Sequence, residues 1–437
     1  MDKNAKTAII GAGFGGLAAA WDLARAGRDV TVFESAAVPG GLAAGFKEPH
    51  WDWYVEKFYH HWFQSDRHML GLIDELGLSG KVVFPRPFTV LLHDGRWYPF
   101  DSIPRALAFP GLGFGIHKLR FGLVGLYLKL TNNWKALERH SAHEWIRRFA
   151  GRHVYETMWE PMLIGKFGPF YKDVNMAWFW ARLKARTTRL GTFEGGFQRF
   201  ADEFAARLQG MGVRIRYETP VESIAPDDDG GLVVRGPGSE PEGFRQVLST
   251  TSPGLLARLV PGLPPEYLAG LESLQHMGAV VLIYSLKHPL STRGFYWFNI
   301  PKNAGYPFLA LVEHTNFVSP EHFGGEHIVY CGDYLPVGHE HFTLSQDELV
   351  ERFTPHLKKF NPDFAPGWIN KTWLFRTPYA QPVPLLDHSR NIPAIRTPLP
   401  GLFFASMSQV YPWDRGTNFA VEIGREAAKM MVADRAG

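Results

Sequence analysis

The sequence predicts an α/β protein in which a parallel sheet flanked by helices is interleaved with an α+β region. Three observations predict this fold. A glycine-rich turn joins a strand to a helix at residues 7–26, further units that combine a helix with a strand occur at 191–224 and 401–431, and two long insertions separate these units. At 437 residues the chain exceeds the usual size of one domain, so we expect two interwoven domains.

The first unit has the spacing of a phosphate-binding turn. Residues 7–10 form a short apolar strand, and a helix over 15–26 begins within the glycine-rich turn. Gly11 allows a tight turn, Gly13 lets the backbone approach a pyrophosphate, and Gly16 lets the helix pack closely on the strand. The N–H groups at the start of this helix, with the positive end of its dipole, then face the phosphates.

An acidic residue follows the second strand at the distance expected for a ribose contact. That strand covers 30–33, and Glu34 lies 18 residues after Gly16. A carboxylate there accepts hydrogen bonds from ribose hydroxyls and repels a 2′-phosphate, which disfavours NADP. The predicted dinucleotide site includes Gly11, Gly13, Phe14, Gly15, Gly16, Glu34 and Ser35.

Gly40 and Gly41 resemble the second glycine pair of FAD proteins in the amine-oxidase superfamily. That superfamily includes monoamine oxidases, protoporphyrinogen oxidases, phytoene desaturases and UDP-galactopyranose mutases. The resemblance implies FAD as the cofactor and a Rossmann-type FAD-binding domain of the GR2 type. The family pattern is Gly-Gly-Arg, whereas Leu42 stands third here and removes one cation near the pyrophosphate.

Two later segments support the same resemblance, closest to the protoporphyrinogen-oxidase and galactopyranose-mutase branches. In 191–224 an amphipathic helix leads to a strand, and the resemblance implies that the backbone of Val221 contacts the adenosine. In 401–431 a buried strand and a loop lead to a helix over 417–432, whose N-terminus would face flavin N1 and O2. Reduction places negative charge there, and a helix N-terminus stabilises it. The residues implied here are Ser406 (where the family has Gly-Asp), Asp414 as a substitute acid, Gly416, Thr417 and Asn418.

The resemblance also divides the chain into domains. The FAD-binding domain comprises residues 1–80, 190–255 and 395–437. The substrate-binding domain comprises 81–189, which starts with a hairpin at Asp94-Gly95 and continues as helices, and 256–394, a mixed sheet crossed by a helix.

Several classes of chemistry are not indicated by the sequence. GLGFG at 111–115 lacks the preceding strand and the following acidic residue, so no second dinucleotide domain is predicted, and the flavin should take electrons from an organic substrate. HExxH and paired CxxC motifs are absent, and His339-Glu340-His341 has no third ligand, so no metal site is expected. Cys331 is the only cysteine, which excludes a disulfide framework.

The candidate catalytic residues lie in three segments between the FAD units. In the mutase branch a histidine-containing segment like 56–70 passes close to the flavin; the alternative is a structural histidine in the core. Helical spacing places Trp178, Arg182 and Arg186 on one face, which fits either a grip on an anionic group or a solvated basic stripe. The segment 375–384 resembles one that returns over the flavin, and Gln381 lies within it. The catalytic candidates are Tyr59, His60, His61, Lys166, Arg182, Arg186 and Tyr379.

Residues 104–130 are apolar enough to lie on a bilayer, but charges and Pro110 interrupt them. The two interpretations are a single interfacial helix and a core helical hairpin. No run of 18 uncharged apolar residues predicts a spanning helix, and no signal peptide is evident, so we expect a cytoplasmic protein, peripheral at most on the inner face of the membrane. The net charge of +3 without a basic run does not indicate nucleic acid as a partner.

The residues and the resemblance together predict an FAD-dependent oxidoreductase. The substrate would be an organic, lipophilic or tetrapyrrole- or isoprenoid-like small molecule, dehydrogenated by hydride transfer to flavin N5, with O2 or a quinone as electron acceptor. The alternatives are a sugar-nucleotide mutase that uses reduced flavin and a flavin-binding protein without turnover.

Overall fold

The computed structural model describes residues 6–185 and 187–434. A five-stranded parallel sheet, in the order β10-β2-β1-β14-β20, forms the centre of its first part. The strands are β1 (Lys6–Ile10), β2 (Asp29–Phe33), β10 (Arg214–Arg216), β14 (Gln246–Ser249) and β20 (Leu402–Phe404). They come from three distant stretches of the chain, which confirms the interleaved α/β fold.

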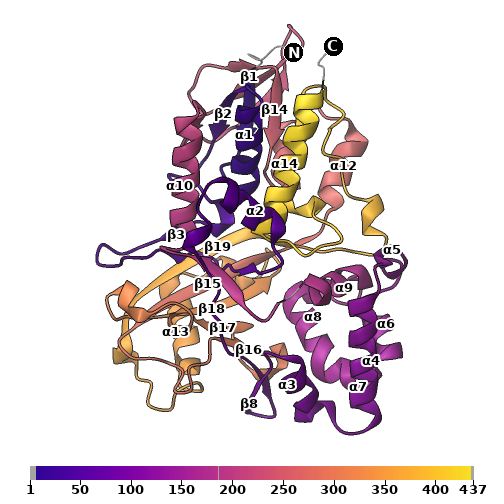
Figure 1. The fold of residues 1–437 in the computed structure, drawn as a ribbon, viewed down its shortest axis with the longest axis vertical. Helices are drawn as coiled ribbons and strands as arrows, with labels where there is room; N and C mark the ends of the chain where they lie inside the picture. Colours follow the sequence, from indigo (N-terminus) through magenta and orange to yellow (C-terminus); the bar gives the residue numbers. More distant parts are fainter. Residues whose placement is uncertain (1–5, 186, 435–437) are drawn as a thin grey trace.

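Both faces of this sheet are covered (Figure 1). One face carries α1 (Phe14–Arg25), α2 (Arg67–Glu75), α10 (Phe197–Gly210) and α14 (Thr417–Ala433). The other carries the small sheet β11 (Ser223–Pro226), β12 (Leu232–Arg235) and β13 (Glu242–Phe244), with α11 (Pro253–Leu259) and α12 (Pro265–Ser273). Successive residues of a strand point to opposite faces, so Ile9 packs beneath the helices while Ala8 and Ile10 join the other core.

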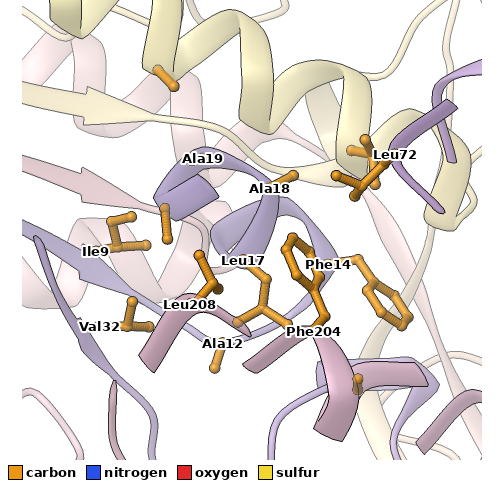
Figure 2. Packing of buried hydrophobic residues seen from close by; sticks show 14 of the residues in the cluster. Ile9, Ala12, Phe14, Leu17, Ala18, Ala19, Val32, Leu72, Phe204 and Leu208 are labelled. Atoms are coloured by element: carbon orange, nitrogen blue, oxygen red, sulfur yellow. The ribbon is translucent and has the colours of Figure 1, made fainter. Parts of the chain in front are cut away.

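The helical face is tightly packed around α1. Figure 2 shows Leu17 and Phe14 of α1 among Phe204 and Leu208 of α10. A Cβ on Gly424 of α14 would lie 2.1 Å from the Gly15 carbonyl oxygen, so the α1–α14 contact requires glycine there. This contact fixes the start of α14 relative to the glycine-rich turn.

The second part is built on a seven-stranded mixed sheet, in the order β19-β15-β18-β17-β16-β7-β8. Its strands are β7 (Thr89–His93), β8 (Arg96–Pro99), β15 (His276–Leu286), β16 (Trp297–Asn299), β17 (Ala310–Glu313), β18 (His327–Leu335) and β19 (Ile369–Pro382). The predicted turn at Asp94-Gly95 joins β7 to β8, with both residues at positive φ, and α13 (Gln346–Leu357) packs on the sheet.

A helical region follows the hairpin, at the lower right of Figure 1. It contains α3 (Ile103–Ala108), α4 (Ile116–Leu130), α5 (Trp134–Leu137), α6 (Ala142–Phe149), α7 (Arg152–Val154), a π-helical turn (Tyr155–Trp159), α8 (Glu160–Phe167) and α9 (Met176–Ala185). The single interfacial helix considered for residues 104–130 is therefore wrong. Pro110 starts a short 3-10 turn, and Gly113 and Gly115 adopt positive φ, so α3 and α4 are separate helices.

Short strands tie the two parts together near the glycine-rich turn. β3 (Gly45–Phe46) pairs with β4 (Val55–Glu56), while β5 (Trp62–Phe63) and β6 (Val82–Val83) both pair with β9 (Leu190–Phe193). The segment that carries Tyr59, His60 and His61 lies between β4 and β5. Phe58 and Tyr59 of this segment pack against residues of the seven-stranded sheet.

Candidate active site

The glycine-rich turn leaves open space where backbone must approach a ligand. Gly11 has φ +109°, and a Cβ on Gly16 would lie 2.0 Å from the Gly11 carbonyl oxygen, so both glycines are required by the fold itself. A Cβ on Gly13, in contrast, would meet only the Cα of Gly41, at 3.8 Å. Gly13 also forms a bridge with Gly40, which brings the two glycine pairs side by side.

Glu34 is buried at the end of β2 and is oriented by the turn. One of its carboxylate oxygens accepts a hydrogen bond from the Ala12 N–H at 2.7 Å, and the other from the Ala36 N–H at 2.8 Å. The Ser35 hydroxyl donates to the second oxygen at 3.3 Å. The oxygen that accepts from Ala12 keeps a second acceptor position, so the carboxylate can still receive a ribose hydroxyl.

The remaining residues predicted around the turn have mixed surroundings. Phe14 is buried and stacks on Phe200, with ring centroids 5.3 Å apart, so it packs in the core. Leu42 lies in a 3-10 turn beside the glycine pair and is half-buried. Val221 is half-buried against the core on the opposite face of the sheet.

The start of α14 is anchored through its side chains. Trp62 Nε1 donates to the Thr417 hydroxyl at 3.0 Å, and the Asn418 side-chain oxygen accepts from the N–H groups of His68 and Met69 at 2.9 and 3.1 Å. The side chains of both residues thus bind β5 and α2. The contribution that Thr417 and Asn418 can offer a ligand is their backbone N–H groups, which the first turn of a helix leaves without helical partners.

Gly416 precedes this helix in extended backbone, with φ 167°, and a Cβ there would meet no atom within 4 Å. The space beside Gly416 and the space beside Gly13 fit a cofactor that spans both glycines. Together with Glu34, they fit FAD, whose ADP half would lie at the turn and whose ring would lie at the start of α14.

Beside the start of α14, charged side chains from two helices meet one carboxylate. Asp414 accepts from Lys166 Nζ of α8 at 3.1 Å, from Arg182 Nη1 of α9 at 3.3 Å and from Trp178 Nε1 of α9 at 2.9 Å. Gln381 of β19 lies 3.5 Å from the same carboxylate. Arg182 pairs with Asp414 and is 20% exposed, so it does not form a solvated basic stripe; a grip of this helix face on an anionic group stays a prediction, and Arg186 lies outside the described residues.

Sequence reasoning missed Arg415 and Tyr334, which complete this group. The Arg415 guanidinium donates to the Tyr334 hydroxyl and lies 5.2 Å from the centre of its ring. The signal that could have found Arg415 is its position between a candidate acid and the predicted start of the helix. Tyr334 could be placed only once the register of β18 was known. We call Lys166, Arg182, Asp414, Arg415 and the rings of Trp178 and Tyr334 the 414 cluster.

Two of the three residues in the predicted aromatic–histidine segment approach this cluster. Tyr59 packs edge-on against Trp297 and Tyr330, and its pKa responds to Tyr334 and Arg415. His60 donates from Nδ1 to the Phe58 carbonyl at 2.6 Å, and Arg415 also acts on its pKa. His61 shares a short hydrogen bond with Tyr296 in an aromatic pocket of the second sheet.

Tyr379 lies against the loop after β20. Its hydroxyl is 2.5 Å from the Ser408 hydroxyl and 3.3 Å from that of Ser406, and Ser406 also caps the turn at residues 407–409. These contacts give Tyr379 and Ser406 a positioning role for the loop that leads to Asp414. Whether either touches the cofactor stays a prediction.

Burial and charge set the protonation states of the group. Burial raises the pKa of Tyr59 well above its ordinary value and lowers the pKa of His60 to about 4, so both are neutral at pH 7. Burial also lowers the pKa of Lys166 well below its ordinary value, against the opposing effect of Asp414. Burial alone would raise the pKa of Asp414, but Lys166, Arg182 and Arg415 outweigh it and hold that pKa below its usual range.

Two features are absent from the described residues. No group of three or more His, Cys, Asp or Glu side chains in residues 6–185 and 187–434 is arranged to hold a metal ion. Within the same ranges, none of the helices combines the length and apolar character that crossing a bilayer requires.

The fold has two parts, a parallel sheet with a glycine-rich turn at its edge and a mixed seven-stranded sheet, which is the architecture expected of a flavoprotein. The chain belongs to the family of flavin containing amine oxidoreductases, whose family model matches residues 14–432. It is therefore an FAD-dependent oxidoreductase, related to enzymes of the protoporphyrinogen oxidase and amine oxidase kind.

Individual relatives match in part by sequence and throughout by fold. The chain is 30% identical over 173 residues to the mitochondrial protoporphyrinogen oxidase of Nicotiana tabacum, covering 37% of this chain and 32% of that one. A putative protoporphyrinogen oxidase from Exiguobacterium sp. 255-15 superimposes with a TM-score of 0.77 at 18% identity, over 98% of this chain and 99% of that one. A reduced UDP-galactopyranose mutase superimposes with a TM-score of 0.75 at 15% identity, over 98% of this chain and 94% of that one. The matches to curated relatives span from 19% to 60% of their lengths.

Proposed function

We propose that the enzyme dehydrogenates a lipophilic, tetrapyrrole- or isoprenoid-like substrate, with O2 or a quinone as the final electron acceptor. The observation that carries this proposal is the position of the 414 cluster. Its residues from α8, α9 and β18 converge on Asp414 and Arg415, immediately before the start of α14, where the resemblance implies that the flavin ring lies. A substrate held there would lie beside the ring.

FAD, when bound, supplies the electron-accepting N5 position that takes a hydride from the substrate. The protein's own residues bind and orient. The rings of Trp178 and Tyr334 hold Arg182 and Arg415 in position, and Tyr59 and His60 are neutral at pH 7. The backbone N–H groups at the start of α14 hold negative charge that develops during reduction.

The names of two relatives, protoporphyrinogen oxidase and 15-cis-phytoene desaturase, support a tetrapyrrole- or isoprenoid-like substrate. The sequence also lacks a second dinucleotide motif, which favours an organic substrate over a nicotinamide cofactor as the electron source.

A sugar-nucleotide mutase is the second candidate, because the 414 cluster contains three cations that suit a pyrophosphate. An anaerobic screen of substrates against the flavin absorbance distinguishes the two. A dehydrogenase loses its oxidised flavin absorbance when substrate is added. A mutase turns over only after prior reduction, with the absorbance unchanged by substrate. An enzyme that shows neither response with any member of a broad panel would contradict both candidates.

We further propose that the enzyme binds the cytoplasmic face of an anionic membrane through α4. One side of this helix exposes large apolar residues three and four positions apart, which defines the α4 outer face: Ile116 59%, Leu119 57%, Leu123 56%, Leu126 55% and Leu130 71% exposed. Phe114, just before the helix, is 87% exposed, and Ile103 on α3 is 73% exposed. The opposite side of α4 packs inward through Val124 and Leu128.

The charge around this face suits anionic lipid. Residues 101–153 carry nine Lys or Arg and three Asp or Glu, a net charge of +6 in a chain whose total is +3. Each half-exposed leucine that moves from water into lipid contributes about 1 kcal/mol to the free energy of membrane binding. Five such residues with basic neighbours therefore give reversible binding, which is the regime of interfacial helices.

The test is co-sedimentation with vesicles of phosphatidylglycerol and phosphatidylcholine. Wild-type protein should pellet, the double variant Leu119→Asp and Leu123→Asp should stay in the supernatant, and Val337→Asp, an equally exposed apolar site elsewhere, should behave like wild type. Wild-type protein that stays in the supernatant at low salt would refute the membrane proposal.

A further inference from the structure

The 414 cluster carries more positive charge than its own carboxylate can balance. Asp414 forms ion pairs with Lys166 and Arg182, and Arg415 adds a third positive charge beside it; no other acid among the described residues ion-pairs with these three side chains. The neighbouring pair Lys302 and Asp333 balances itself. Burial lowers the pKa of Lys166, but its contact with Asp414 opposes this and favours the protonated form. With Lys166 protonated, the cluster has an excess of about two positive charges in a largely buried position, where the side chains of Lys166 and Arg182 are 9% and 20% exposed.

Two polar atoms in this group have no protein partner. Arg415 Nε is buried without an acceptor, and the side-chain oxygen of Gln381, a residue that is 2% exposed, is buried without a donor. Buried donors and charges are normally paired, because an unsatisfied one costs on the order of 1–3 kcal/mol. Unbalanced charge together with an unused guanidinium donor indicates that a ligand completes the cluster.

The origin of the cations argues that this ligand is the substrate and not the cofactor. Lys166 and Arg182 come from α8 and α9, in the helical region that lies away from the parallel sheet (Figure 1). The phosphates of FAD have their own place at the glycine-rich turn, with its open space beside Gly13.

Aromatic rings hold the cations in position. Lys166 Nζ and Arg182 Cζ lie 5.3 and 5.6 Å from the centre of the Trp178 ring, and Arg415 lies over Tyr334. The rings thus preorganise the charged groups, and guanidinium groups favour phosphate and carboxylate oxygens in paired geometry.

We propose that the 414 cluster binds a dianionic group of the substrate, either a diphosphate or two neighbouring carboxylates. This inference rests on the proposed function for the placement of the substrate beside the flavin. A dianion matches the excess charge, whereas a single carboxylate would leave one buried cation without a counter-ion. The substrate is accordingly amphipathic, with an apolar body and a doubly charged end.

The test is a titration of the FAD-loaded enzyme at constant ionic strength with inorganic pyrophosphate, succinate and acetate, followed by the flavin difference spectrum. Pyrophosphate or succinate should bind saturably, and acetate should bind at least tenfold more weakly. Preference for pyrophosphate identifies the diphosphate source, and preference for succinate identifies paired carboxylates.

Variants locate the binding. Arg182→Gln should raise the dissociation constant of the preferred dianion by about ten- to a hundredfold, the loss expected for one charged hydrogen-bond partner. The dissociation constant of Arg182→Lys should lie between those of wild type and Arg182→Gln. Lys172 is an exposed lysine in the turn before α9, and the dissociation constant of Lys172→Gln should match that of wild type. Flavin content and thermal unfolding of each variant show that it is folded.

The titration of the wild-type enzyme tests dianion binding even if a variant fails to fold. Equal weak binding of all three anions, or binding unchanged in folded Arg182→Gln, would overturn the assignment. Saturable dianion binding in an enzyme whose flavin no substrate reduces would keep this inference and contradict the dehydrogenase proposal instead.

Discussion

Replacing Gly416 by leucine tests whether the start of α14 controls the flavin. Because Gly416 has extended backbone and a Cβ would meet no atom within 4 Å, the protein itself should accept the larger side chain. The helix cannot simply retreat as a unit, since Thr417 and Asn418 are held by Trp62 and the first residues of α2. The leucine should therefore displace the flavin edge from the backbone N–H groups.

The magnitude follows from the hydrogen bonds at that edge. A donor to a charged acceptor contributes about 1–3 kcal/mol, and these donors favour the anionic reduced flavin over the neutral oxidised form. At about 30 mV per 1.4 kcal/mol, losing one donor lowers the two-electron potential by about 20–60 mV. Gly416→Ala, with a smaller side chain, should lower it less.

The assay is a reductive titration of the FAD-loaded variants against a reference dye. Gly338→Leu is the matched control, because that glycine is also exposed with no atom within 4 Å of an added Cβ. An unchanged potential in fully loaded Gly416→Leu would mean that α14 does not stabilise the reduced flavin.

Two further predictions concern the turn and the 414 cluster. Gly13→Val should fold but purify without FAD, because its side chain fills the open space at the turn, and yellow Gly13→Val protein would contradict the assignment. Gly16→Ala should instead lower the melting temperature, because its Cβ would lie 2.0 Å from the Gly11 carbonyl oxygen. Asp414→Asn should reduce the free energy of unfolding, measured in urea at pH 7, by on the order of 3–5 kcal/mol, because it leaves buried cations unbalanced. The folded-state pKa of Asp414 is depressed, so its stabilisation is present in full above the unfolded pKa of about 4, starts to decrease below it and is lost as the pH falls through the folded-state pKa. The difference from wild type should therefore be smaller at pH 3 than at pH 7, and an identical difference at both pH values would refute the ion-pair role.

Local patterns predicted most of the FAD-side fold. The strand–turn–helix spacing around Gly11, Gly13 and Gly16 depends on neighbouring residues only, so the sequence contains all that determines it. The break between α3 and α4 was also readable, because Pro110 and two glycines lie within the segment that was considered as one helix.

The site required the tertiary structure. Asp414 meets Lys166 and Arg182 across more than 200 residues of chain, and no periodicity predicts which helices will face one loop. The side chains of Thr417 and Asn418 illustrate the same limit. Their position at the helix start was predictable, but their contacts with Trp62 and α2 depend on how separate elements pack.

The stretch from Asp414 to Asn418 links the two halves of the proposed chemistry. Its first residues organise cations from the helical region, and its last residues begin a helix whose N-terminus is positive. Both arrangements place positive potential near one point, where a substrate anion and a reduced flavin would each gain from it. Since α14 is packed on α1 and cannot shift without breaking the glycine contact at Gly424, one short segment would hold the proposed substrate recognition and the proposed flavin stabilisation in fixed register.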